Sequence, residues 1–187
     1  MPRQDEYLPS YSSALIKFRM SVSRPEVICG SVASLHIHAA SAGQPLTSVP
    51  SIEAVEEMGI RDDPRYFGRR TADGEPSSRQ VTLMEREQMA EHAVALGVQC
   101  LPPGTVRANI ETFGIRLVPL VDKTIQVGDA ILYLTKPRDP CEKMDRACQG
   151  LRALMNNHRQ GVLARVVRSG TIRVGDLVTL LSQPRVE

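Results

Sequence analysis

The fold of this chain is indicated first by the stretch Ile125-Gln126-Val127-Gly128-Asp129-Ala130-Ile131-Leu132-Tyr133-Leu134. Its pattern returns in Ile172-Arg173-Val174-Gly175-Asp176-Leu177-Val178-Thr179-Leu180-Leu181. Each copy predicts a short strand, a Gly-Asp turn and a second strand, as in the hairpins and corners of small β-barrels. Two copies are too few for a solenoid, so the repeat indicates a barrel.

A helical segment is predicted between the two copies. Its apolar residues recur at intervals of three and four and place Cys148 in the core; they are Met144, Ala147, Cys148, Leu151, Leu154 and Met155. Gly150 is expected to divide the segment into two short helices. Residues 162–168 then read as a strand that leads into the second copy.

The chain before the first copy predicts further short strands and one longer helix. A strand is expected to begin at Gly30, and a loop is expected over 39–50. Residues 51–60 are ambiguous, with a weak helical period that ends at Gly59. Residues 61–78 are expected to form a loop rich in charged residues, which is either a solvated loop or an active-site lid.

Residues 79–83 predict a strand and residues 85–96 a helix that ends at Gly97. The apolar side of this helix is expected to comprise Met89, Ala90, Ala93, Val94 and Leu96. Residues 106–110 and 115–118 predict two more strands.

These elements predict a mainly β protein. Many short strands, two or three helices and no βαβ alternation favour a closed, mostly antiparallel β-barrel with the helices at its rim. Residues 1–27 are rich in Pro, Ser and Arg and are expected to form an N-terminal arm, either disordered or draped over the domain. The domain is expected to span residues 28–187.

Composition excludes several classes of function. The chain has 23 Lys and Arg against 21 Asp and Glu, a net charge of +2, which is too small for a general nucleic-acid or membrane-surface binder. We find no apolar run of membrane-spanning length and no signal peptide, so a cytoplasmic protein is expected. The four cysteines lack a Cys-x-x-Cys pair, so reduced thiols are expected, with neither a zinc site nor a disulfide framework.

One cysteine stands in an unusual setting, in the segment Thr135-Lys136-Pro137-Arg138-Asp139-Pro140-Cys141-Glu142. Asp139 can cap a helix, Pro140 suits its first position and Glu142 can complete a capping box. Cys141 would then lie in the first turn, where free amide groups and the nearby Arg138 favour a thiolate. The segment predicts a nucleophile, a sulfur carrier or a ligand for a soft metal. The alternative is a small buried apolar residue.

Two histidines, His36 and His38, would share one face of the first strand. This spacing can chelate a metal, but a third ligand is not evident. Two half-exposed histidines on a sheet are therefore the expected arrangement.

The chain resembles the MOSC domain, found at the C-terminus of molybdenum-cofactor sulfurases and as free-standing small proteins of bacterial type. The resemblance covers roughly residues 28–183. The residues that carry it follow the family's order: Gly30-Ser31-Val32, Gly59-Ile60-Arg61-Asp62-Asp63, Arg79-Gln80-Val81-Thr82-Leu83, Arg107-Ala108-Asn109-Ile110, Val127-Gly128-Asp129, Pro137-Arg138-Asp139-Pro140-Cys141, Gly161, Ala164-Arg165-Val166, Gly170 and Val174-Gly175-Asp176.

The resemblance implies a closed barrel related to the pyruvate-kinase barrel and a cleft for molybdenum cofactor, that is, molybdopterin with its metal. It implies that Cys141 is the catalytic residue, which carries sulfur or ligates molybdenum. It also implies a set of cofactor-binding residues: Arg79, Arg107, Asn109, Arg138 and Arg165. The implied function is sulfuration or delivery of the cofactor, or molybdenum-dependent reduction of N-hydroxylated compounds.

Two departures from the family pattern matter. The chain has Asp62-Asp63-Pro64-Arg65-Tyr66 where many relatives have Gly-Asp-(Arg/Lys)-His, and so lacks that histidine. It also lacks the pyridoxal-phosphate domain of full-length sulfurases. A separate sulfur donor of the cysteine desulfurase type, or a redox partner protein, is therefore expected.

Two other functions stay open. One is a non-catalytic barrel that binds another anionic ligand or a protein partner. The other is a thiol enzyme that uses Cys141 without a metal, for which His158 is the nearest candidate base in the sequence.

Overall fold

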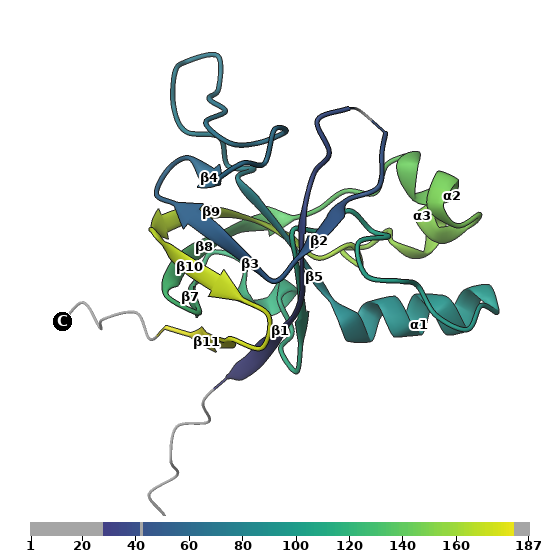
Figure 1. Cartoon of the computed structure of the whole chain (residues 1–187). Helices are drawn as coiled ribbons and strands as arrows, with labels where there is room; N and C mark the ends of the chain where they lie inside the picture. Colours follow the sequence, from purple (N-terminus) through teal and green to yellow (C-terminus); the bar gives the residue numbers. More distant parts are fainter. Residues whose placement is uncertain (1–27, 42, 182–187) are drawn as a thin grey trace, which may run out of the picture.

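The computed structural model describes residues 28–41 and 43–181. The predicted N-terminal arm, residues 1–27, lies outside the described residues. The first strand of the described residues is β1 (Cys29–Ile37), which starts close to the predicted Gly30. Figure 1 shows a barrel with the helices gathered on one side of it.

Seven strands close the barrel in the order β11-β7-β8-β9-β5-β6-β1, and β11 pairs back onto β1. With β1, they are β5 (Val81–Glu85), β6 (Ile110–Phe113), β7 (Thr124–Val127), β8 (Ala130–Pro137), β9 (Val162–Arg168) and β11 (Leu177–Leu180). Closure removes the open sheet edges, and the inward apolar residues of the seven strands form one core. The mainly β barrel expected from the sequence is confirmed.

Four shorter strands and one helical turn complete the β part. β2 (Thr47–Val49) pairs with the C-terminal part of β1. A separate sheet has the order β10-β3-β4, formed by β10 (Gly170–Arg173), β3 (Ser51–Val55) and β4 (Gly59–Ile60). A 3₁₀ turn, η1 (Val118–Leu120), precedes β7.

The two Val-Gly-Asp copies play different roles in the barrel. The first is a true hairpin, in which β7 and β8 pair directly with Val127 opposite Ala130. The second is a corner, because β10 pairs with β3 in the small sheet whereas β11 pairs with β7 and β1 in the barrel. The two copies meet, since the amide of Asp129 donates to the carbonyl of Thr171 at 3.1 Å.

The chain contains one βαβ unit, which the sequence pattern did not indicate, although β and α elements do not alternate through the fold. β5 and β6 are parallel neighbours, joined through α1 (Arg86–Leu96) and the loop after it. All five residues of β5 are buried, as expected for a strand covered on both faces. One face of β5 packs into the core inside the barrel. The other face carries Met84, which belongs to a second apolar cluster outside the barrel.

The second cluster holds the three helices of the described chain against the barrel. Its buried residues are Met84, Met89, Ala93, Leu101, Val106, Ala108, Met144, Leu151 and Met155. The predicted break at Gly150 is confirmed, because Gly150 adopts φ 87° between α2 (Lys143–Ala147) and α3 (Leu151–Leu154). Cys148 packs against this cluster only partly buried.

Several local predictions are wrong because tertiary pairing overrides local propensity. Residues 51–60, for which the weak helical period left the structure ambiguous, form β3 and β4, since β10 supplies a pairing partner that periodicity cannot show. Residues 106–109 and 115–117 are not strands. Val94, expected on the apolar side of α1, is 81% exposed, whereas His92 is buried.

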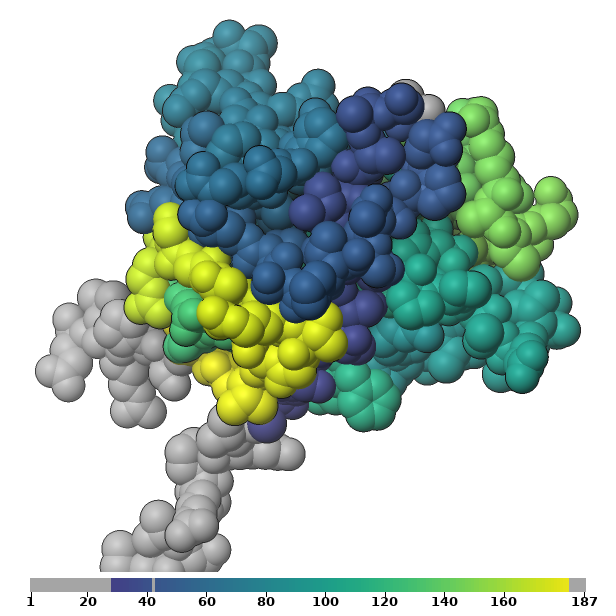
Figure 2. Space-filling view, in the orientation of Figure 1, coloured from purple at the N-terminus to yellow at the C-terminus, as the bar shows by residue number. Residues whose placement is uncertain are grey.

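The register of the strands brings several connections together on the barrel. Leu35 of β1 lies opposite Ile110 of β6, which lies opposite Leu83 of β5. Val162 of β9 lies opposite both Leu83 and Pro137 of β8. The segments that follow β1 and β8 and those that precede β6 and β9 therefore begin near one another. The 61–78 loop stands out from the molecule as a protrusion at the top of Figure 2.

Candidate functional site

A cavity of about 300 Å³, here called the cysteine cavity, opens where these connections meet. Its lining runs along the sequence from His38, the residue after β1, to Gln160, two residues before β9. The lining residues are His38, Arg65, Tyr66, Arg79, Thr82, Arg107, Arg138, Asp139, Cys141, Glu142, Lys143, Met144 and Gln160. Residues from 38 to 160 in the sequence are thus gathered around one thiol.

Four of the residues predicted from sequence line this cavity together: Cys141, Arg79, Arg107 and Arg138. Cys141 and Arg79 are exposed, Arg107 is half-buried and Arg138 is buried. With Arg65 and Lys143, the lining holds five cationic side chains against the two carboxylates of Asp139 and Glu142. Its charge suits an anionic ligand.

The helix expected around Cys141 begins later than the capping pattern predicts. α2 starts at Lys143, and its N-cap position is Glu142, without a side-chain cap. The amide of Arg138 still donates to the carbonyl of Gly161 at 3.0 Å, so the chain leaves the barrel only after this residue. Cys141 therefore stands in the connection before α2, where its carbonyl accepts the amide of Met144 at 3.0 Å.

Arg138 is the most unusual charge of the cavity. Its residue is 6% exposed, and Nη2 donates to the carbonyl oxygens of Val106 at 3.1 Å and Arg107 at 3.4 Å. Nε and Nη1 are buried and have no hydrogen-bond partner among the described residues. Burial, and then the charges of Arg79 and Arg107, lower the pKa of Arg138 to about 10. A buried guanidinium with free donors is costly unless an acceptor binds it.

Tyr66 joins the cationic groups of the cavity. The guanidinium carbons of Arg65 and Arg79 lie 5.3 Å and 5.6 Å from the centroid of its ring, and Arg65 Nε donates to its hydroxyl oxygen at 2.9 Å. The ring is buried and fixes both side chains, since cation–π contact limits where a guanidinium lies. Burial and the charge of Arg65 also lower the pKa of Arg107.

His38 and Asp63 form a buried pair beside the cavity. Nδ1 of His38 lies 2.9 Å from Oδ2 of Asp63, and the His38 ring meets Tyr66 edge-on at 5.2 Å. Burial alone would raise the pKa of Asp63, but the hydrogen bonds and charge of His38 and the amide of Arg65 bring it below its usual value. The carboxylate is therefore ionised and accepts the proton of Nδ1, so Nε2 is the ring nitrogen left for other partners.

The expectation of two half-exposed histidines is wrong. His36 is fully buried and His38 is 5% exposed. Nδ1 of His36 lies 3.0 Å from the carbonyl oxygen of Ala108, so the two rings bind different partners. Among the described residues, no group of three or more His, Cys, Asp or Glu side chains could hold a metal ion.

Asn109, a predicted cofactor-binding residue, lies in the layer beneath the cavity. It is fully buried and donates from Nδ2 to Asp63 Oδ2 at 2.9 Å and to the carbonyl of His36 at 3.2 Å. Its Oδ1 accepts the hydroxyl of Thr82 at 2.7 Å. Asn109 therefore orients Asp63, and through it His38, and does not line the cavity.

Arg165, the other predicted cofactor-binding residue, lies elsewhere. It is opposite Tyr133 in the β8–β9 pair, between the buried residues Ala164 and Val166. Because side chains alternate across a strand, Arg165 faces the outside of the barrel. The structure does not bring it to the cysteine cavity.

The candidate base His158 is not part of the cavity lining. It is exposed, adopts φ 65°, and lies in the turn after α3. The histidine that does line the cavity is His38. Sequence reasoning missed its pairing with Asp63, although the Gly59-Ile60-Arg61-Asp62-Asp63 motif that contains its partner was among the family matches.

None of the helices in the described residues is long and apolar enough to cross a membrane. No curated protein matches the chain. Solved structures do resemble it. The YUAD protein of Bacillus subtilis is 20% identical, with a TM-score of 0.69 over 85% of this chain and 99% of that one.

Two structures of YiiM are also similar. The protein from Geobacillus stearothermophilus is 16% identical, with a TM-score of 0.62 over 84% of this chain and 77% of that one. The protein from Escherichia coli is 18% identical, with a TM-score of 0.57 over 84% and 70% of the two chains. These likenesses show the same fold.

The sequence model of the MOSC domain matches residues 55–179, which is more than half of the chain. The matched range contains most of the cavity lining, including Cys141 and all four arginines. The chain therefore belongs to the MOSC domain family.

Proposed function

We propose that the cysteine cavity binds molybdenum cofactor and that Cys141 serves there as a ligand of the metal or as a carrier of sulfur. The MOSC family is associated in general with this cofactor. The observation that carries the proposal is the pair of unpartnered donors, Nε and Nη1 of Arg138, buried at a cavity with an exposed thiol.

The residues present fit the group. Molybdopterin is an anion with a phosphate and a dithiolene, and planar guanidinium groups suit bidentate binding of phosphate oxygens. Arg79, Arg107 and Arg138 would hold the anionic part, and the soft sulfur of Cys141 suits a thiophilic metal. When bound, the cofactor supplies two-electron redox chemistry or a site that accepts sulfur.

The protein's own groups would then have distinct tasks. The cationic lining surrounds Cys141 with positive charges, which attract an anionic ligand to the thiol. Asp63 holds the proton on Nδ1 of His38, so Nε2 can accept or donate one at the cavity. Thr82 and Asn109 keep Asp63 in place.

The test is the molybdenum and pterin content of protein purified from a molybdenum-replete host, together with a persulfide assay. We expect wild type to carry molybdenum or persulfide and Cys141→Ala to lose it. Cys29→Ala is the matched control, because Cys29 is also an exposed free cysteine but lies on β1 outside the cavity. Wild-type protein without molybdenum, pterin and persulfide would refute the proposal.

A non-catalytic module that binds another anion is the second candidate, favoured by the same excess of cationic groups. It predicts that Cys141→Ala has no effect on anion binding, whereas removal of Arg138 or Arg107 abolishes it. Measuring both variants with the same anion separates the two functions. Protein purified with bound molybdenum or persulfide can then be assayed as an enzyme, as a carrier, and as a partner of a sulfur donor or reductase.

A further inference from the structure

A second cavity of about 520 Å³ lies next to the cysteine cavity, and here it is called the apolar cavity. The two share Arg107 and Lys143 in their linings. The apolar cavity is bounded by the 43–46 segment, by Val98 just beyond the end of α1, by the 100–105 turn and by the helix α2. A single ligand could therefore extend from one cavity into the other.

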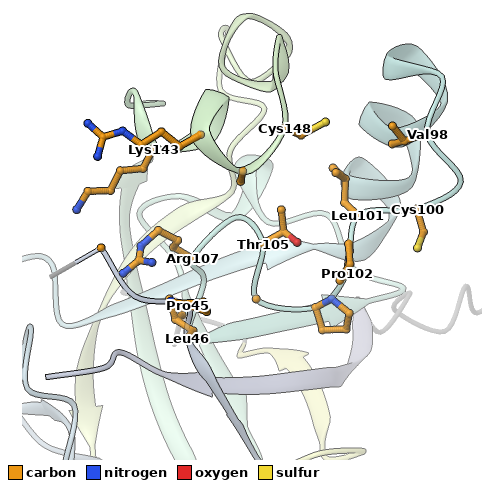
Figure 3. Close-up of a pocket in the computed structure, with 15 residues that line it drawn as sticks. Pro45, Leu46, Val98, Cys100, Leu101, Pro102, Thr105, Arg107, Lys143 and Cys148 are labelled. Carbon is orange, nitrogen blue, oxygen red and sulfur yellow. The ribbon is translucent and has the colours of Figure 1, made fainter. Parts of the chain in front are cut away.

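The lining of the apolar cavity has two chemically different ends. Figure 3 shows Arg107 and Lys143 at one end, with Val98, Leu101 and Cys100 at the other. Arg146 adds a third cation, although it is ion-paired with Glu142 at 2.6 Å. The lining residues include apolar side chains, three cations, two cysteines and no carboxylate.

The 100–105 turn is held rigidly by buried charge. Glu111 is fully buried, and its Oε1 accepts the amide of Gly104 at 2.8 Å while Oε2 accepts Arg86 Nη1 at 3.0 Å. Arg86 also donates to the carbonyl of Leu101 at 3.2 Å. These hydrogen bonds hold the turn at Leu101 and at Gly104, so the cavity is largely formed before a ligand binds.

We propose that the apolar cavity is a substrate subsite, which takes the apolar body of an organic anion whose charged end lies among the cations shared with the cysteine cavity. The inference that the cavity binds an organic anion is independent of the proposed function. Only the description of that anion as a substrate rests on the proposed function. The two residues shared by both linings, Arg107 and Lys143, support the inference, and so does a lining that pairs apolar surface with positive charge. A hydrocarbon body gains free energy from burial, and the anionic end gains from the guanidinium.

The probe is 2-naphthoate, with uncharged 2-naphthalenemethanol as its isostere. The chain contains no tryptophan, so naphthalene fluorescence can be read with little protein background. Titration of wild type with 2-naphthoate should saturate, and the alcohol should bind at least about 10-fold more weakly because it lacks the charge.

Val98 and Val94 provide a matched pair of variants. Val98 lines the apolar cavity and is 37% exposed, whereas Val94 lies on α1 one turn earlier, is 81% exposed and is not part of the lining. Val98→Glu should weaken 2-naphthoate binding at least about 10-fold by placing a carboxylate among the apolar groups. Val94→Glu, with the same change of charge, should bind as wild type does.

The molybdenum content of the same variants separates this inference from the proposed function. Under the inference, Val98→Glu retains wild-type molybdenum content and loses only the probe. Loss of molybdenum in Val98→Glu would assign the cavity to the cofactor and overturn the inference. Failure of wild type to bind the probe, or equal binding by Val98→Glu, would overturn it as well, whatever the molybdenum content.

Discussion

Nδ1 of His38 donates to Oδ2 of Asp63 across 2.9 Å, and both side chains are almost wholly buried. The Asp63 carboxylate accepts four further hydrogen bonds. They are donated by the side-chain amide of Asn109 and by the backbone amides of Arg65, Tyr66 and His38. One carboxylate therefore fixes the end of β1, the 61–78 loop and the segment before β6. Asp63 does not line the cysteine cavity itself, but it holds in place the segments that do.

The first prediction concerns Asp63→Asn. An amide cannot accept all of these donors, so we expect a loss of about 2–3 kcal/mol in the free energy of unfolding at pH 7. Because the folded pKa of Asp63 is lowered, the carboxylate's contribution is present above its unfolded pKa of about 3.9 and is lost as the pH falls through the lower folded value. Urea unfolding of both proteins at pH 7 and near pH 3 should show the gap between them narrowing in acid. A gap that does not change with pH would contradict the assignment.

The second prediction concerns Arg138→Met. Removing a buried guanidinium with two unpartnered donors should leave the free energy of unfolding unchanged or raise it by about 1 kcal/mol. The same change should reduce binding of inorganic phosphate at least about 10-fold, because the cavity loses its most desolvated cation. Arg165→Met is the control, since that side chain faces outside the barrel and its loss should leave phosphate binding intact. Denaturation and phosphate titration measure the two effects separately, and a strongly destabilised Arg138→Met would contradict the account.

The third prediction concerns the ion pair of Arg86 and Glu111, in which Glu111 is fully buried and the Arg86 side chain is 27% exposed. Glu111→Gln should destabilise the protein by about 2–3 kcal/mol, because the charged hydrogen bond to Arg86 is lost while Arg86 keeps some contact with water. The double variant Arg86→Met with Glu111→Gln should recover part of that loss. A double-mutant cycle by urea unfolding measures the coupling, and additive losses would show that the two residues act independently.

The fourth prediction concerns Gly161, which precedes β9 and whose carbonyl accepts the amide of Arg138. It adopts φ 75°, and an added Cβ would clash with the carbonyl oxygen of Leu83 on β5. Gly161→Ala should therefore cost more than about 2 kcal/mol or prevent folding. Gly74→Ala tests the backbone effect alone, since Gly74 has φ 85° but open space around it, and should cost about 1 kcal/mol. Equal unfolding midpoints for the two variants would contradict the steric argument.

The sequence by itself determined the type of fold and singled out Cys141 as the candidate cysteine. Alternation of apolar residues and the two Val-Gly-Asp turns depend on neighbours in the chain, so they predicted β7, β8 and β9 well. The break at Gly150 followed from its backbone freedom in the same local way. Cys141 stood out because Pro, Arg and Asp flank it, and the family resemblance linked it to Arg79, Arg107 and Arg138.

Only the tertiary structure decided which polar residues meet. Arg165 has the same side chain as Arg138, but strand alternation turns it outward while Arg138 becomes buried with unsatisfied donors. His38 gained its role from Asp63, 25 residues away, and Asn109 gained its own from the parallel pairing of β5 and β6. Local patterns specify strands and turns because these depend on adjacent residues. The burial of Arg138 and the gathering of cationic side chains around Cys141 depend on contacts that exist only once the barrel has closed.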